Sequence, residues 1–364
     1  MVDMSDGLAV SVLDFVGMRV GESEGSAIAR SVELARRAEK WGYKRYWLGE
    51  FHSITGVASS ATAVLIGHMA SATKRIRVGS GGVMLPNHAP LVVAEQFGTL
   101  EALYPGRIDL GVGRAPGGDS HAMRALGRDM GKGDAFSKLG VFSERIEELR
   151  SFLGAEKPGQ QVRAIPGQGS NVPISVLGSS CFSAEIAANL GLPYAFAAHF
   201  APEFRLEAAA LYRKQFKASA VLRKPYLLMA VPVIAAETDG AALRLFTTAQ
   251  QRFLRMIRNE QVGLLPAVDS MQPLWSEKEQ AAVNAKLDAA IVGSESTVKA
   301  GLEKLVRQTG ADEVIVVTDT FEQADRLDSY RRVAEIAAKL KIGADGEKAA
   351  KGEKAAKAVE KIPS

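Results

Sequence analysis

Four of the five histidines in the sequence follow short apolar runs, in stretches that also carry glycine, serine and acidic residues. His52 comes two residues after Glu50, and His88, His121 and His199 follow later runs of the same kind. An imidazole exchanges protons near neutral pH, so each of these side chains is a candidate general acid or base. Their shared placement points to one polar pocket, although loops are polar in most proteins and the histidines then need share no role.

A second candidate site lies at residues 178–183, where Gly-Ser-Ser-Cys-Phe-Ser joins an apolar run to a helical pattern. Backbone N–H groups at a helix start attract anions, and Ser179, Ser180 and Ser183 add hydroxyls, so this segment is suited to a phosphate. The alternative is that Ser180 only caps the helix, which needs no ligand.

Arg114 follows the run before that segment, in the glycine-rich stretch 111–118. A guanidinium forms two parallel hydrogen bonds with a phosphate, so Arg114 and the serines together favour a phosphate site. Two carboxylates, Asp119 and Glu50, are the alternative partners of Arg114.

Gly81 and Gly82 end an earlier apolar run, where a bare backbone allows a flat ligand to approach closely or forms an ordinary tight turn. The sequence contains no H-E-x-x-H, G-x-S-x-G or Walker A pattern. The one cysteine, Cys181, excludes an intrachain disulfide and a multi-cysteine metal site, and we interpret it as a packing residue rather than a nucleophile. We therefore expect no metal site.

Eight apolar, β-branched runs alternate with amphipathic segments, which is the pattern of a parallel sheet covered by helices. Eight repeats favour a closed (β/α)8 TIM barrel over a doubly wound open sheet, and no G-x-G-x-x-G follows the first run. In such a barrel the candidate residues all follow strand ends and therefore meet at one mouth. The expected strands are residues 8–13, 45–49, 76–79, 108–112, 174–177, 194–197, 227–234 and 314–317.

Seven helices are expected between these strands, and two segments interrupt the alternation. Residues 154–172 are rich in Gly, Pro and Gln and predict a long loop or hairpin. Residues 238–292 predict an insertion after the seventh strand, with two further helical patterns around residues 243–257 and 278–290. We expect one domain over residues 1–342 and a disordered Lys/Ala/Glu tail over 343–364. The expected helices are residues 27–41, 91–103, 142–152, 184–190, 203–216, 297–306 and 327–340.

Composition agrees with a folded protein that binds small molecules. The 364 residues are 47% hydrophobic and 24% charged, close to the globular average, and the net charge of +4 gives little support for nucleic-acid binding. The N-terminus lacks the pattern of a signal peptide and no long uncharged apolar run occurs, so we expect a cytoplasmic protein with no membrane partner.

Three stretches of the sequence resemble the bacterial luciferase-like, flavin-dependent monooxygenase family. They are RYWLGEFH at residues 45–52, RIRVGSGGVMLPNHAP at 75–90 and PGRIDLGVGRAPG at 105–117, with a weaker fourth, LGSS, at 177–180. The resemblance extends from about residue 8 to residue 330. It is greatest to the single-chain, uncharacterised branch of the family rather than to light-emitting luciferase.

The resemblance implies a TIM barrel that binds reduced FMN at the carboxyl ends of its strands. Arg114 with Ser179, Ser180 and Ser183 would hold the FMN phosphate, and Gly81–Gly82 would lie against the isoalloxazine through a non-proline cis peptide. A separate flavin reductase would supply reduced FMN, and O2 would be the co-substrate. A peroxyflavin would then oxidise a small organic substrate, and we expect a homodimer.

One position departs from the family pattern. Many relatives carry Glu-His-His after the second strand, where this sequence has Glu50, Phe51 and His52. A phenyl ring cannot transfer a proton, so His52 is our candidate acid/base, with Glu50 as the other catalytic residue. The alternative is a structural His52 bonded to Glu50 or to loop backbone.

The sequence is also compatible with two other functions. A deazaflavin-dependent hydride-transfer oxidoreductase of the same superfamily would use the same fold with another cofactor. A non-catalytic flavin-binding protein is the second alternative, because Phe51 removes one proton-transferring ring.

Overall fold

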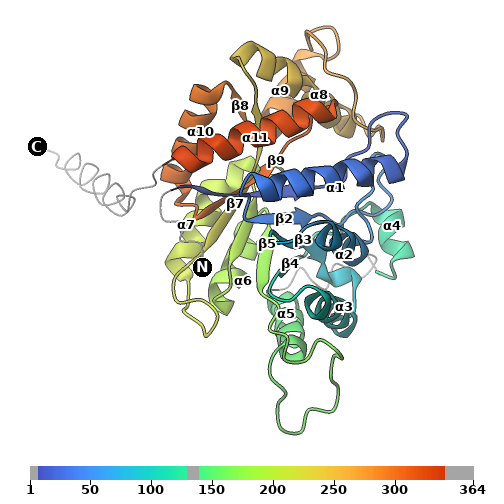
Figure 1. Ribbon diagram of the computed structural model, residues 1–364, viewed down its shortest axis with the longest axis vertical. Helices are drawn as coiled ribbons and strands as arrows, with labels where there is room; N and C mark the ends of the chain where they lie inside the picture. The colour runs from blue at the N-terminus through green and yellow to red at the C-terminus, as the bar shows by residue number, and fades with distance from the viewer. Residues whose placement is uncertain (1–6, 129–138, 341–364) are drawn as a thin grey trace, which may run out of the picture.

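The computed structural model describes residues 7–128 and 139–340, and its centre is a closed barrel of parallel strands (Figure 1). Each strand pairs with the next along the chain from β1 to β7, and β9 pairs with both β7 and β1 to close the ring. The closed ring confirms the TIM barrel and excludes the open sheet. The strands are β1 (Ala9–Asp14), β2 (Arg45–Leu48), β3 (Arg77–Met84), β4 (Ile108–Gly113), β5 (Ile174–Gly178), β6 (Tyr194–Ala197), β7 (Leu227–Ala235), β8 (Ile291–Gly293) and β9 (Glu313–Val317).

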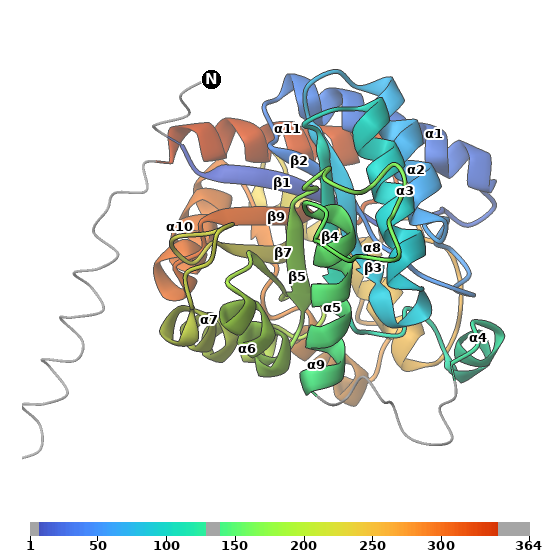
Figure 2. The ribbon, with the colours of Figure 1, turned by 90° about the horizontal axis from the view of Figure 1, so that it is seen from below.

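Helices surround the barrel, as the view from below shows (Figure 2). The expected helices are all present, with ends within a few residues of the predicted ones. Two further helices, α2 and α4, were not predicted as elements. The helices are α1 (Glu24–Lys40), α2 (Thr62–Ala72), α3 (Pro90–Leu103), α4 (Ser120–Ala125), α5 (Leu139–Leu153), α6 (Cys181–Leu190), α7 (Arg205–Gln215), α8 (Asp239–Ile257), α9 (Glu277–Lys286), α10 (Glu295–Thr309) and α11 (Gln323–Lys339).

Side chains alternate between the barrel interior and the helix layer. Val10 and Val12 of β1 pack in the core beneath the helices, whereas Leu13 packs inside the barrel with Trp47 and Ile315. Successive strand residues point to opposite faces, and both faces are apolar here, which explains the continuous apolar runs in the sequence.

A buried ion-pair network closes the N-terminal end of the barrel. The guanidinium of Arg45 lies 2.9 Å from a carboxylate oxygen of Glu313 and 2.9 Å from one of Asp109. Arg77 lies 2.6 Å from the other oxygen of Asp109, and the Ser11 hydroxyl donates to Glu313 at 2.5 Å. Each of these four charged side chains therefore has a partner of opposite sign.

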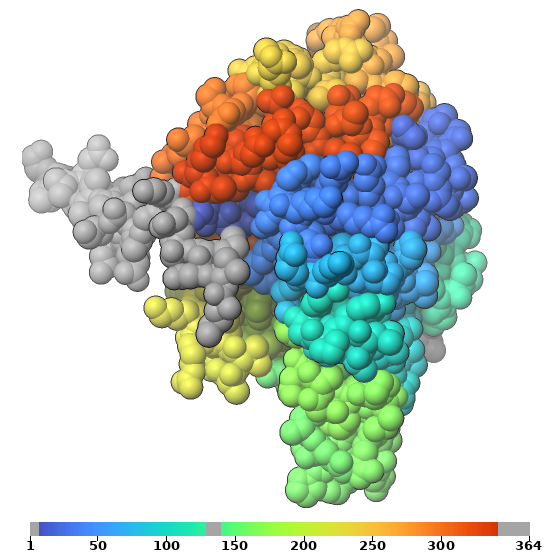
Figure 3. All heavy atoms as spheres, viewed as in Figure 1, coloured from blue at the N-terminus to red at the C-terminus, as the bar shows by residue number. Residues whose placement is uncertain are grey.

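Residues 238–292 lie between β7 and the last barrel strand, in the place expected for an insertion. They contain α8 and α9 and most of β8, a short strand that pairs with the outer end of β7 and that the sequence pattern did not predict. This region forms the yellow and orange top of the space-filling view, and the loop 154–172 projects at the bottom (Figure 3). The tail 343–364 lies outside the described residues.

Within residues 7–128 and 139–340, no helix is long and apolar enough to cross a membrane.

Candidate functional site

Glu50 connects two of the candidate histidines at the carboxyl end of the barrel. Its carboxylate oxygen Oε1 accepts a hydrogen bond from Nε2 of His52 at 2.8 Å and from Nε2 of His88 at 2.8 Å. The other oxygen, Oε2, accepts from the Met84 backbone N–H at 3.0 Å. Glu50 is buried, whereas both imidazoles are partly exposed, so the rings face outward from a fixed carboxylate.

These hydrogen bonds determine the protonation of the cluster. Burial by itself raises the pKa of Glu50, but the hydrogen bond and charge of His88, the hydrogen bond from His52 and the Met84 N–H outweigh it and leave that pKa below its ordinary value. An ionised carboxylate only accepts hydrogen bonds, so Nε2 carries the proton in each ring. Each Nδ1 is then the ring nitrogen that can accept a hydrogen bond from a ligand.

The loop after β4 holds this cluster in place. The Pro116 carbonyl accepts from the Asn87 amide at 3.0 Å, and the Gly117 carbonyl accepts from the His52 backbone N–H at 2.7 Å. One carboxylate oxygen of Glu50 and one imidazole nitrogen each of His52 and His88 lie within 4.8 Å of one another, a spacing that would also admit a divalent cation. The two 2.8 Å hydrogen bonds account for the same spacing.

Gly81 and Gly82 end the regular part of β3, and the peptide bond between them is cis. The pairing register between β3 and β4 shifts between Ser80 and Val83. A Cβ on Gly81 would lie 2.6 Å from Leu13, and one on Gly82 would lie 2.7 Å from the Gly111 carbonyl oxygen. Close packing within the barrel wall therefore requires both glycines, whether or not a flat ligand covers them.

The guanidinium of Arg114 lies beside the start of α6. It lies 4.2 Å from the centre of the Phe182 ring, and it makes no hydrogen bond or ion pair with any residue that the structure describes. The two carboxylates considered as its partners are engaged elsewhere: Asp119 accepts from backbone N–H groups of α4, and Glu50 accepts from the histidines. A half-buried guanidinium that has no anionic partner within residues 7–128 and 139–340 is suited to bind an anion.

The serines at the start of α6 divide into two kinds. Ser180 occupies the N-cap position but makes no side-chain cap hydrogen bond, which is the opposite of the simple capping interpretation. Ser183 is buried, and its hydroxyl donates to the Ser180 carbonyl at 2.9 Å and lies 3.1 Å from the Tyr194 hydroxyl. Ser179 and Ser180 therefore have the freer hydroxyls, and Ser183 together with Tyr194, which the sequence pattern did not single out, holds the turn in shape.

The four loop histidines do not share one pocket, which corrects that part of the sequence interpretation. His52 and His88 meet on Glu50, whereas His121 is exposed on α4. His199 is 4% exposed and packs on the rings of Phe15 and Phe200. His121 lies on α4 after β4, the strand next to β3, but on the exposed side of that helix, whereas His199 follows β6 and packs among aromatic rings.

Phe51 packs where the family pattern has an imidazole. Its ring meets Phe15 edge to face, with centroids 5.1 Å apart, and lies 6.4 Å from Phe200. Phe51 is therefore part of an apolar aromatic cluster, next to the hydrogen-bonded Glu50 and His52.

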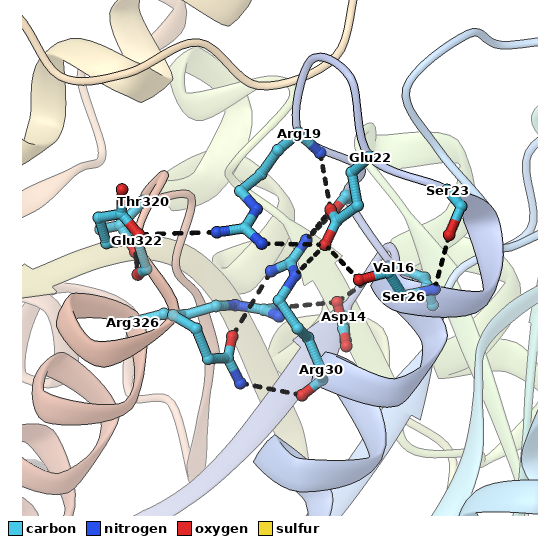
Figure 4. Close-up of polar contacts among 12 residues, drawn as sticks. Asp14, Val16, Arg19, Glu22, Ser23, Ser26, Arg30, Thr320, Glu322 and Arg326 are labelled. Carbon is cyan, nitrogen blue, oxygen red and sulfur yellow. Dashed lines mark hydrogen bonds and ion pairs between the residues drawn. The ribbon is translucent and has the colours of Figure 1, made fainter.

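A second polar cluster, between β1, α1 and α11, is saturated (Figure 4). Arg326 lies 2.8 Å from Asp14, and Arg30 lies 2.6 Å from Glu22 and donates to the Gly17 carbonyl at 2.7 Å. Burial raises the pKa of Glu22, but hydrogen bonds from Arg30 and Arg19 outweigh it and bring that pKa to about 2. Because its charges are matched, we assign this cluster to fastening α11 against the barrel rather than to ligand binding.

Comparison with known proteins gives the family. The sequence matches the family described as luciferase-like monooxygenase over residues 8–313. Protein YvbT of Bacillus subtilis is 52% identical over 331 residues, which cover 90% of this chain and 96% of YvbT. A luciferase-like monooxygenase of Escherichia coli (strain K12) is 46% identical over 333 residues, 92% of this chain and 98% of that protein.

Solved structures share the fold. Apo-MsnO8 superposes with a TM-score of 0.79 at 34% identity, covering 92% of this chain and 99% of that one. The oxygenating constituent of 3,6-diketocamphane monooxygenase from Pseudomonas putida, solved with FMN, gives 0.69 at 18% identity over 93% and 100% of the two chains. An F420-dependent secondary alcohol dehydrogenase gives 0.65 at 13% identity over 91% and 99%. The last two likenesses concern the fold alone.

Proposed function

Because the chain belongs to the luciferase-like monooxygenase family, we propose that it is a monooxygenase that uses reduced FMN and O2 to oxidise a small organic substrate. The single observation that carries this proposal is the half-buried Arg114 guanidinium, which has no anionic partner among the described residues and lies beside the uncapped start of α6. Reduced FMN, when bound, supplies the electrons that activate O2, and the protein supplies binding and orientation.

In this proposal the phosphate of FMN would lie between Arg114 and the start of α6. Arg114 provides the charge, and the hydroxyls of Ser179 and Ser180 and the first N–H groups of α6 provide further donors. Ser183, our third predicted ligand, contributes by fixing the Ser180 carbonyl, since its hydroxyl already donates there. The isoalloxazine would lie along the end of β3 at Gly81 and Gly82.

Proton transfer belongs to the Glu50 cluster in this proposal. Glu50 holds the Nε2–H of His52 and of His88, so the free Nδ1 of each ring can take up or return a proton at the reacting centre. The hydrogen bond from His52 to Glu50 matches the structural alternative for His52, and it also orients a catalytic imidazole, so kinetics must separate the two. His88 joins His52 as a second candidate acid/base.

A deazaflavin-dependent hydride-transfer enzyme is the second candidate, because an F420-dependent dehydrogenase shares the fold. A non-catalytic flavin-binding protein is the third. A separate reductase, a homodimer and a cytoplasmic location remain predictions from the sequence.

The test is direct titration followed by turnover. Full-length protein is titrated with oxidised FMN, reduced FMN and reduced F420, and the reduced complex is then mixed with 18O2 and small aldehydes, ketones and thioethers. The proposal expects tight binding of reduced FMN and transfer of 18O to an organic product. Tight binding of F420 with reduction of a substrate and no 18O transfer would favour the second candidate, and FMN binding without any product would favour the third.

A further inference from the structure

The contact between Arg114 and Phe182 is unusually close. The guanidinium carbon of Arg114 lies 4.2 Å from the centre of the Phe182 ring. The other contacts between an arginine and an aromatic ring within residues 7–128 and 139–340 measure 5.5 to 5.9 Å. A guanidinium over an aromatic ring is attracted by the negative face of that ring. The Phe182 ring therefore holds the end of the Arg114 side chain.

Phe182 is itself anchored. It is the second residue of α6, and its half-buried side chain packs against the core between the barrel and the helices. An arginine side chain has several rotatable bonds, and fixing them costs entropy that a ligand would otherwise have to supply on binding. A contact that fixes Arg114 in advance lowers this cost.

A ring holds a guanidinium differently from a carboxylate. At the other end of the barrel, Arg45 is held by Glu313 and Asp109, which neutralise its charge and accept from its N–H groups. The Phe182 ring has no net charge and no oxygen or nitrogen acceptor, so the charge and the N–H donors of Arg114 stay available to an anion. The ring positions Arg114 without satisfying it.

The helical turn that carries Phe182 also supplies the other donors of the phosphate site. The first N–H groups of a helix have no acceptor within the helix, and the Ser180 side chain makes no cap hydrogen bond at this end of α6. A phosphate at this helix start would reach these N–H groups and the Arg114 guanidinium together. Phe182 fixes the position of the guanidinium relative to them.

We propose that Phe182 is a positioning residue for the phosphate site, and that its ring holds the Arg114 guanidinium at the start of α6 with its charge and donors free for the phosphate. The inference rests on the proposed function for FMN as the ligand. Because the ring acts through Arg114, it strengthens the binding of a flavin that carries a phosphate and not that of the same flavin without one.

The alternative is that the ring competes with the phosphate, so that the guanidinium must leave Phe182 in order to bind FMN. Removal of the ring would then strengthen FMN binding, whereas removal of a positioning ring weakens it. The two interpretations therefore predict changes of opposite sign for one substitution.

The test compares reduced FMN with reduced riboflavin in anaerobic calorimetric titrations of the full-length protein. Phe182→Leu keeps an apolar side chain and removes the aromatic face. We expect it to weaken FMN binding about three- to fivefold, with riboflavin affinity within about 1.5-fold of the wild-type value. Phe182→Tyr keeps the ring and should bind FMN within about 1.5-fold of wild type.

A double-mutant cycle shows whether the ring acts through Arg114. In the Arg114→Ala background, Phe182→Leu should change FMN affinity by less than about 1.5-fold, because the group that the ring holds is gone. Phe321→Leu is the matched control. It removes a ring that lies 5.5 Å from the Arg19 guanidinium, between β9 and α11, and should change neither flavin affinity.

A measurement on the wild type covers the case in which Phe182→Leu does not fold. The ring current of Phe182 shifts the Arg114 Nε–H resonance upfield, and Phe182→Tyr helps to assign it. We expect this upfield shift to persist when reduced FMN saturates the protein.

Unchanged or tighter FMN binding in Phe182→Leu, an equal loss for riboflavin, or a loss in Phe182→Tyr as large as in Phe182→Leu would overturn the inference. An undiminished effect in the Arg114→Ala background or disappearance of the upfield shift on FMN binding would also overturn it. None of these readouts requires oxygen chemistry. A protein that shows the ring effect but transfers no 18O keeps the inference and loses the proposed function. A protein that transfers 18O while Phe182→Leu binds FMN like the wild type gives the reverse result.

Discussion

At the N-terminal end of the barrel, Arg45, Arg77, Asp109 and Glu313 satisfy one another, whereas at the carboxyl end several polar groups have no partner of their own among the described residues. Arg114 has no counter-charge in the part of the chain that the structure describes, and the Ser180 hydroxyl makes no cap hydrogen bond. Both ends contain buried or half-buried polar side chains. The difference indicates that the N-terminal end stabilises the fold and that the carboxyl end is suited to bind a ligand.

Breaking the N-terminal network should have the largest effect. Arg45→Met leaves the carboxylates of Asp109 and Glu313 buried with fewer partners, so we expect the free energy of unfolding to fall by about 3–5 kcal/mol in urea denaturation. Arg331→Met removes a surface guanidinium with two carboxylate partners and should cost less than about 1 kcal/mol. Equal losses in the two variants would remove the distinction between the ends.

The corresponding change at the carboxyl end should affect chemistry more than stability. His52→Ala should slow substrate oxygenation about 10²-fold with little change in flavin affinity, measured by stopped-flow mixing of reduced complex with O2. Phe51→His is the complementary variant, and a higher turnover would indicate that this branch has lost a proton-transferring ring. Loss of stability in His52→Ala with normal kinetics would support the structural role.

Acid should weaken the N-terminal end through its carboxylates. Burial raises the pKa of Glu313, but Arg45, Lys44 and hydrogen bonds outweigh it and leave that pKa below its ordinary value of 4.5. Glu313 therefore stabilises the fold above about pH 4.5, and this contribution is lost as the pH falls through the lower folded value. Between about pH 5 and 3, the free energy of unfolding of Glu313→Gln should fall by about 1–2 kcal/mol less than that of the wild type. The control variant Glu277→Gln, at an exposed position, should show the same dependence of unfolding free energy on pH as the wild type. Parallel slopes for all three proteins would contradict this role.

The smallest effect is expected from the tail. Deletion of residues 343–364 should leave the melting temperature and flavin binding unchanged, because the sequence there has no apolar face. Calorimetric melting of both forms with and without FMN checks this. A large drop in melting temperature on deletion would mean that the tail contributes to the stability of one of the two ends of the barrel.

The barrel was predictable because buried parallel strands are continuous apolar runs, and the eight predicted runs match the eight strands of the ring. The inserted helices also showed a helical pattern. Helix α2 did not, because residues 62–70 are apolar on most sides and show no polar face. The strand β8 has three residues, too few for any pattern.

The site was predictable only where its parts are close in sequence. Glu50 and His52 are two residues apart, and a hydrogen bond between them was one of the alternatives that the sequence offered. The bond from His88 to the same carboxylate spans 38 residues, so only the closed ring brings them together. The division of the serines at 179–183 depends on Tyr194, which lies on the neighbouring strand.

The central claim is that Arg114 at the carboxyl end holds a phosphate, and the comparison of FMN with riboflavin tests it most directly. Titration of wild-type protein and Arg114→Ala with both flavins should show that the variant loses about 2–3 kcal/mol of FMN binding, with riboflavin affinity within about twofold of wild type. Arg124→Ala, on exposed α4, is the matched control and should change neither. Equal loss of FMN and riboflavin binding in Arg114→Ala, or no loss of either, would contradict the account.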